Sequence, residues 1–107
     1  MSWGKSMRWL EIIFIRTGRV SEGKIDPVIE KMTKVYEVPH LVEAACYSHA
    51  MIPGDYAVIL SWDIHQPNLG SDLALGLMQE LKRFGLVDHS LWVAGENFMG
   101  NPLDPVI

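Results

Sequence analysis

The stretch R8-W-L-E-I-I-F-I-R16 decides the fold of this chain. It is rich in β-branched and aromatic residues, which favours a β-strand. Successive side chains of a strand point to opposite faces of a sheet. In this stretch both alternating sets of side chains are mainly apolar. That pattern is typical of a strand that is covered on both faces. Residues 8–16 therefore predict a central strand.

Two amphipathic helices and three further strands are predicted after it. Pro27 suits the first turn of a helix, Pro39 ends that helix, and Gly85 suits the end of the second helix. A Pro-Gly pair at residues 53 and 54 favours a turn between two strands. The predicted order is a strand (8–16), a helix (26–36), a hairpin of two strands (40–50 and 55–64), a helix (71–84) and a strand (86–94).

This order predicts a ferredoxin-like α+β fold of the split βαβ kind. Right-handed crossovers then give a four-stranded antiparallel sheet in the order 4-1-3-2, with both helices on one face. We expect one domain over residues 1–107, with a core at 8–95 and a C-terminal arm at 96–107. The helix-free face must be apolar, because the first strand is apolar on both sides. A second copy of the chain is the expected cover, giving a homodimer.

Composition limits the classes of partner. The 107 residues include 13 acidic and 9 basic ones, for a net charge of -4, so we expect no nucleic-acid partner. No run of about 18 apolar residues is present to span a membrane. Cys46 is the single cysteine and cannot form an internal disulfide. A cytoplasmic protein is the expectation.

The chain resembles the dimeric α+β barrel superfamily, which includes the antibiotic-biosynthesis-monooxygenase-like proteins. The resemblance rests on the element order, on Trp62 near the end of the third strand, and on the passage L81-K-R-F-G-L-V-D-H-S-L-W92. It implies a homodimer. It also implies an activity on small molecules, because the superfamily contains cofactor-independent oxygenases, haem-degrading enzymes, isomerases and dismutases.

The resemblance assigns a role to Trp62, since oxygenase members line the substrate cavity with a tryptophan on the third strand. The asparagine that matches it in those members has no counterpart in residues 8–16. Haem-degrading members use a histidine on the second helix, and residues 71–84 contain none. We therefore expect no cofactor.

The hairpin supplies the candidate site. If Ile52 lies opposite Asp55, one face carries aromatic, imidazole and aliphatic groups together: Tyr47, His49, Leu60 and Trp62. A longer loop or a bulge would change this register. An apolar hollow with a few polar groups is typical of a small-molecule site. The predicted roles are His49 as general base, and Tyr47, Trp62 and Leu60 as substrate-binding residues. The same face could instead form the dimer core.

The other polar groups predict no chemistry. Ser61 is four residues from His65, about 13 Å along a strand, so these residues and Asp63 cannot form a nucleophilic triad. Asp63 could orient His65, but a solvated strand end also explains both residues. His89 and Trp92 occupy opposite faces of the last strand, and we expect no metal site.

The sequence thus predicts a homodimeric barrel that binds a small apolar or aromatic ligand. It would act as a cofactor-independent monooxygenase or isomerase on an aromatic or enolic compound. The alternative is a non-catalytic interaction module whose barrel is filled solid.

Overall fold

A computed structural model of the chain describes residues 8–18, 25–34, 38–64 and 70–94. The predicted C-terminal arm and His65 lie outside the described residues. The elements follow the predicted order: β1 (Trp9–Arg16), α1 (Ile25–Lys34), β2 (Leu41–Ser48), β3 (Asp55–Trp62), α2 (Asp72–Leu81) and β4 (Leu86–Val93).

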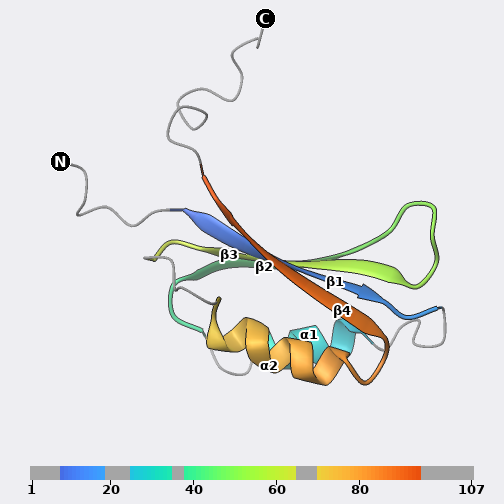
Figure 1. Ribbon diagram of the computed structural model, residues 1–107. Coiled ribbons are helices and arrows are strands. Elements are labelled where there is room, and N and C mark those ends of the chain that lie inside the picture. The colour runs from blue at the N-terminus through green and yellow to red at the C-terminus, as the bar shows by residue number, and fades with distance from the viewer. Residues whose placement is uncertain (1–7, 19–24, 35–37, 65–69, 95–107) are drawn as a thin grey trace, which may run out of the picture.

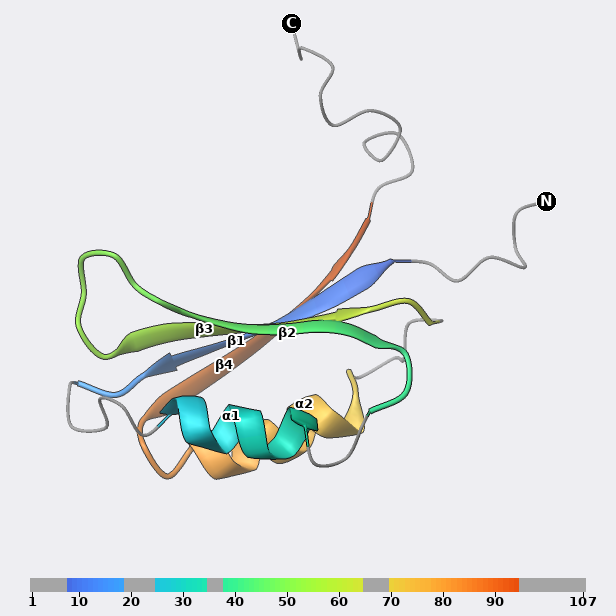
Figure 2. The ribbon, with the colours of Figure 1, turned by 180° about the vertical axis from the view of Figure 1, so that it is seen from behind.

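The four strands form one antiparallel sheet in the order β2-β3-β1-β4. This is the predicted order 4-1-3-2 read from the other edge, so the predicted α+β fold is confirmed. Both helices lie on the same face of the twisted sheet, as Figures 1 and 2 show from opposite sides. Neither α1 nor α2 covers the opposite face.

The core lies between the sheet and the helices. The residues of β1 that face the helices are Trp9, Glu11, Ile13 and Ile15, and each of them is buried. Apolar side chains of β3 and α2 fill the space next to them: Val58, Leu60, Trp62, Ala74, Leu77 and Leu81. Burying these side chains supplies the main stabilisation of the fold, at about 1.5–3 kcal/mol for each large aliphatic group.

The predicted register of the hairpin is wrong. Tyr47 pairs with Ala57 and Ser48 pairs with Tyr56, and the register shifts between Leu41 and Glu43. The loop between the strands is therefore longer than the predicted two residues. A register change by an odd number of residues turns every side chain of one strand to the other face relative to its partner. From Glu43 to Ser48, β2 therefore presents to each face the set of side chains opposite to that predicted, whereas before the bulge Leu41 pairs with Trp62.

β1 presents mainly apolar side chains to the helix-free face, as the pattern of residues 8–16 predicts. Leu10 and Ile12 of β1 are half-buried on it. Three aromatic side chains lie about half exposed there: Phe14, Tyr47 and Trp92, at 47%, 56% and 56%. Aromatic side chains are enriched at interaction surfaces and at ligand sites.

Candidate functional site

A carboxylate is buried in the apolar core between the sheet and the helices. Glu11 of β1 is fully buried, and its two oxygens have four hydrogen-bond contacts. Oε2 accepts from Trp62 Nε1 at 2.8 Å and from Ser71 Oγ at 2.5 Å. Oε1 accepts from the backbone N–H of Ser71 at 2.9 Å and lies 3.0 Å from His89 Nε2. These bonds offset the large free-energy cost of removing the carboxylate from water.

Four separate segments bring these residues together, and we call Glu11, Trp62, Ser71 and His89 the carboxylate cluster. Trp62 and His89 lie on the strands flanking β1, each diagonal to Glu11: Trp62 pairs with Trp9, and His89 pairs with Ile13. Diagonal neighbours on one sheet face are within reach of long and aromatic side chains. The pairing of β1 with both neighbours therefore builds three members of the cluster.

Ser71 joins the cluster from the N-terminus of α2. Its extended backbone is that of an N-cap, and its hydroxyl accepts from Ala74 N at 3.0 Å. A serine at this position satisfies one of the free N–H groups of the first helical turn. The Ser71 oxygen accepts the hydrogen bond from Ala74 N, so the hydroxyl hydrogen can be donated to Glu11. The positive end of the helix dipole also favours a carboxylate here.

Gly70 lies next to Glu11 and His89 in the cluster. Its φ is +98°, in the region that favours glycine. A Cβ added to Gly70 would lie 2.8 Å from both Glu11 Oε1 and His89 Cε1, closer than side chains tolerate. Glycine is therefore needed at this position for the contact between the chain and the Glu11–His89 pair.

The four site residues predicted from the sequence do not share a face. Trp62 and Leu60 are buried against the helices, and Trp62 stacks on Trp9 with ring centroids 5.8 Å apart. Tyr47 is on the helix-free face, opposite Ala57. The changed hairpin register is the reason, so one pocket within this chain cannot contain all four side chains.

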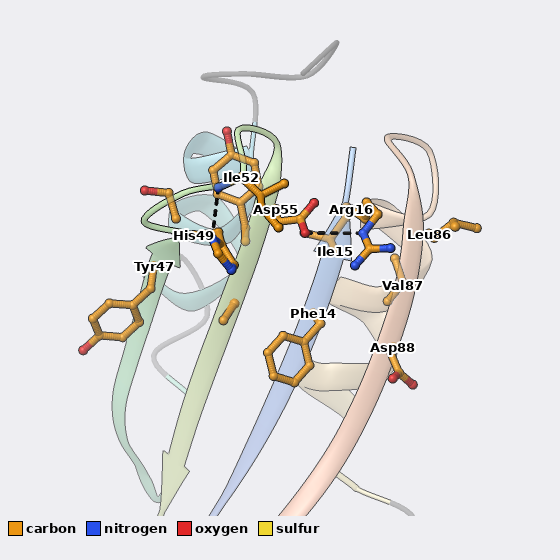
Figure 3. A pocket seen from close by; sticks show the side chains of 13 residues that line it. Phe14, Ile15, Arg16, Tyr47, His49, Ile52, Asp55, Leu86, Val87 and Asp88 are labelled. Atoms are coloured by element: carbon orange, nitrogen blue, oxygen red, sulfur yellow. Dashed lines mark hydrogen bonds and ion pairs between the residues drawn. The ribbon is translucent and has the colours of Figure 1, made fainter. Parts of the chain in front are cut away.

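Tyr47 and His49 instead line a hollow of about 520 Å³ on the helix-free face, which we call the outer hollow. Figure 3 shows both residues on the β2 side of it, Asp88 on the β4 side, and Phe14 between them. The Arg16–Asp55 ion pair, at 3.3 Å, lies at its upper end in that view. Aromatic walls with a few polar groups are suited to a small ligand.

His49 is held by the loop that follows β2. Its Nδ1 accepts hydrogen bonds from Met51 N at 2.9 Å and from Ile52 N at 3.0 Å. A neutral imidazole that accepts through Nδ1 carries its proton on Nε2. In this conformation His49 offers the outer hollow a hydrogen-bond donor, whereas the predicted base would need a free lone pair.

Asp63 and His40 lie together at the surface. Asp63 is exposed, and its carboxylate is 3.5 Å from His40 Nδ1. His89 and Trp92 occupy opposite faces of β4, as expected from their spacing. Among the described residues no group of three or more His, Cys, Asp or Glu side chains could hold a metal ion. Within the same part of the chain, neither helix is long and apolar enough to cross a membrane.

The sequence interpretation missed Glu11, Ser71 and His89 as members of one cluster. One signal for Glu11 was present: it is the only charged residue between the two arginines of R8-W-L-E-I-I-F-I-R16. A single carboxylate in a strand buried on that face needs partners. The sequence does not tell which partners these are, because Trp62, Ser71 and His89 are 51, 60 and 78 residues away.

Comparison with known proteins identifies the fold. No protein-family profile matches the chain, and no curated protein sequence matches it. Among solved structures it is similar to a variant of SnoaB, a cofactor-independent oxygenase from Streptomyces nogalater, with a TM-score of 0.63 and 14% identity. That match covers 85% of this chain and 96% of SnoaB.

Two further solved structures have the same fold. One is a candidate antibiotic biosynthesis monooxygenase from Caulobacter crescentus, with a TM-score of 0.62, 12% identity, and coverage of 85% of this chain and 92% of the other. The other is a conserved protein of unknown function from Bacteroides thetaiotaomicron, with a TM-score of 0.62, 5% identity, and coverage of 83% and 99%. The chain therefore has the α+β fold of the antibiotic-biosynthesis-monooxygenase-like proteins, as the sequence resemblance predicted.

Proposed function

We propose that this chain forms a homodimer that binds a small aromatic or enolic compound and acts on it without a bound cofactor, as a monooxygenase or an isomerase. The observation that carries the proposal is the carboxylate cluster. It combines a buried carboxylate, an indole and an imidazole with 13% of its side chain exposed. A carboxylate hydrogen-bonded to an imidazole is an arrangement found in sites that transfer protons.

The position of Trp62 supports this reading. The oxygenases of the resembled superfamily line their substrate cavity with a tryptophan of the third strand, and Trp62 is the last residue of β3. It faces the helices and binds Glu11. The fold shared with SnoaB adds support, because that protein is a cofactor-independent oxygenase. The substrate would lie against the exposed side of His89.

The homodimer is supported by the helix-free face. Its exposed aromatic groups are Phe14 and Tyr47 at the outer hollow, and Trp92, which pairs with Leu10 near the other end of β1. A second copy packed face to face would remove these groups from water, and an isologous contact needs only this one surface. Such a dimer would enclose the outer hollow between two sheets.

The outer hollow is a second candidate position for the ligand, favoured by its volume of about 520 Å³. Tyr47 would hold an aromatic ring there, and His49 would donate a hydrogen bond to a phenolate or enolate oxygen. This arrangement keeps both residues as candidate ligand-binding groups. It gives His49 a stabilising role and leaves the proton transfer to another residue.

An enolisable three-ring compound, anthrone, tests the activity. Incubation with the full chain in air should yield anthraquinone and water from anthrone and one O₂, measured by oxygen uptake and absorbance. Trp62→Phe should lower the rate at least tenfold if the ligand lies at the carboxylate cluster. Tyr47→Ala should do so if it lies in the outer hollow.

The dimer is tested separately by sedimentation of the 12.1 kDa chain at micromolar concentration. We expect twice the monomer mass for the natural sequence and the monomer mass for Phe14→Asp. A dimer that neither binds nor converts anthrone or other enolisable aromatics would favour the alternative, a non-catalytic interaction module.

A further inference from the structure

We propose that His89 is the general base of the carboxylate cluster, that its Nδ1 takes the proton, and that Glu11 is a positioning residue that fixes this tautomer. The inference rests on the proposed function and names the residue that begins its chemistry. The step is a single proton transfer: the O–H or acidic C–H bond of the bound compound breaks, its electron pair stays on the compound, and an N–H bond forms at Nδ1.

The hydrogen bonds of Glu11 determine which imidazole nitrogen is protonated. An indole N–H and a backbone N–H can only donate, so Trp62 and Ser71 N both donate to the carboxylate. The Ser71 hydroxyl is already an acceptor for Ala74 N and therefore donates its hydrogen to Glu11. Three of the roughly four lone-pair directions of the carboxylate are thus filled by donors.

The fourth direction faces His89 Nε2 at 3.0 Å. A carboxylate has no hydrogen to donate, so the imidazole is the donor in this contact and Nε2 carries the hydrogen. A neutral imidazole holds one hydrogen, and the lone pair is then on Nδ1. A carboxylate that orients an imidazole through one nitrogen and leaves the other basic is the arrangement of catalytic acid–histidine pairs.

The basic nitrogen is open to a ligand. In the described part of the chain Nδ1 of His89 has no hydrogen-bond partner, and no buried side-chain nitrogen or oxygen there lacks one. Nδ1 is therefore in contact with solvent, consistent with the 13% exposure of the side chain. His89 lies on β4, an edge strand of the sheet, where a compound can approach without displacing a neighbouring strand.

Gly70 leaves the space that the His89 ring occupies. A Cβ at this position would lie 2.8 Å from Cε1, the carbon between the two nitrogens, so a larger residue would displace the ring. The ring is held at Nε2 by Glu11, while Nδ1 stays free. A positioned base contributes on the order of 10²- to 10⁴-fold to a proton transfer.

The other two described histidines lack this arrangement. Nδ1 of His49 accepts two backbone hydrogen bonds, which leaves a protonated Nε2. His40 has a side chain that is 54% exposed, and its only ionic partner among the described residues is Asp63 at 3.5 Å. His89 therefore stands apart as an oriented imidazole with a buried carboxylate on one nitrogen and solvent on the other.

Nitrogen NMR of the ¹⁵N-labelled full chain tests the tautomer without any substrate. We expect a protonated Nε2 and an unprotonated Nδ1 for His89 in the neutral protein. In Glu11→Gln the side-chain amide can donate to Nε2, so the hydrogen should move to Nδ1. A protonated Nδ1 in the natural chain, or the same tautomer in both proteins, would overturn the positioning role of Glu11.

An aromatic probe, 5-nitrobenzisoxazole, tests the base itself. A base removes the hydrogen on its C3 while the ring N–O bond breaks, giving 2-cyano-4-nitrophenolate, which absorbs visible light. The natural chain should accelerate this elimination at least tenfold over His89→Gln, whereas His40→Asn, a matched surface control, should keep the full rate. Equal rates for the natural chain and His89→Gln would refute the base.

Folding and function are separated by two further measurements. Circular dichroism shows whether each variant is folded. If His89→Gln is unfolded, the tautomer measured by NMR in the natural chain and in Glu11→Gln decides whether the proposal holds. Anthrone binding and sedimentation report on the proposed function independently. If the chain binds anthrone but does not accelerate the benzisoxazole elimination, the role of His89 is refuted and the proposed function is not. If it accelerates the elimination but does not oxidise anthrone, the proposed substrate class is refuted and the role of His89 is not.

Discussion

The two faces of the sheet differ in the solvent exposure and the hydrogen bonding of their polar groups. On the helix-covered face, Glu11 has no exposure to solvent and has four hydrogen-bond contacts from three other segments. On the helix-free face, Tyr47 is about half exposed, and Asp88 lies at the surface of the outer hollow. On the covered face the polar groups of the cluster have fixed hydrogen-bond partners within an apolar core, whereas on the free face aromatic and charged groups are exposed to solvent.

The difference shows which face is fully packed within a single chain. Polar groups buried in a low-dielectric core must be paired, and their geometry is then fixed by those partners. Exposed aromatic groups need no hydrogen-bond partner. They stabilise the protein only when a ligand or a partner subunit removes them from water. Changes to the covered face should therefore affect folding of the single chain, whereas changes to the free face should affect association or binding.

The largest contrast is between two glutamates. Glu11→Ala leaves the Trp62, Ser71 and His89 donors buried without their acceptor, and should lower the free energy of unfolding by about 3–5 kcal/mol. Glu43 is exposed on β2. Glu43→Ala should change the same quantity by less than about 0.5 kcal/mol. Urea denaturation measures both. Equal losses would show that the buried contacts of Glu11 add nothing.

Neighbouring apolar residues of β1 give the next contrast. Ile13 is fully buried against the helices, and Phe14 beside it is 47% exposed on the free face. Ile13→Ala should cost about 3 kcal/mol of unfolding free energy, because it leaves a cavity in the core. Phe14→Ala should cost under about 1 kcal/mol at a dilution where the chain is monomeric. A larger loss for Phe14 would contradict the assignment of the faces.

Tryptophan substitutions sharpen the comparison at the level of one hydrogen bond. Trp62→Phe keeps an aromatic ring but removes the N–H that binds Glu11, so we expect a loss of about 1–3 kcal/mol of unfolding free energy. Trp92→Phe removes an exposed hydrogen bond to Ser90 Oγ and should cost about 0.5 kcal/mol or less. Thermal unfolding followed by circular dichroism would rank the two variants.

The smallest expected effect concerns the loop after β2. His49→Ala removes the acceptor of two exposed backbone N–H groups and should cost about 1 kcal/mol of unfolding free energy. Met51 is 83% exposed in the same loop, so Met51→Ala serves as the control, with a change under about 0.5 kcal/mol. No difference between the two variants would show that His49 does not stabilise the turn.

The candidate site was harder to predict than the fold because it depends on register. Trp62 was identified from its place near the end of the third strand, and it does lie in the carboxylate cluster. The sequence places Tyr47 and His49 on the same face as Trp62 only if Ile52 lies opposite Asp55 in the turn. The observed loop is longer, and β2 is bulged between Leu41 and Glu43. Turn length is weakly encoded locally, yet it decides the face of every residue of a strand.

The sequence by itself determined the six elements, their order and the apolar character of both sheet faces. These follow from local periodicity, from proline and glycine positions, and from the fixed handedness of crossovers, none of which needs distant contacts. Only the tertiary structure decided that Glu11 meets Trp62, Ser71 and His89. That cluster exists because three strands pair in one register and α2 begins beside them. Such pairing is fixed by the packing of the whole core.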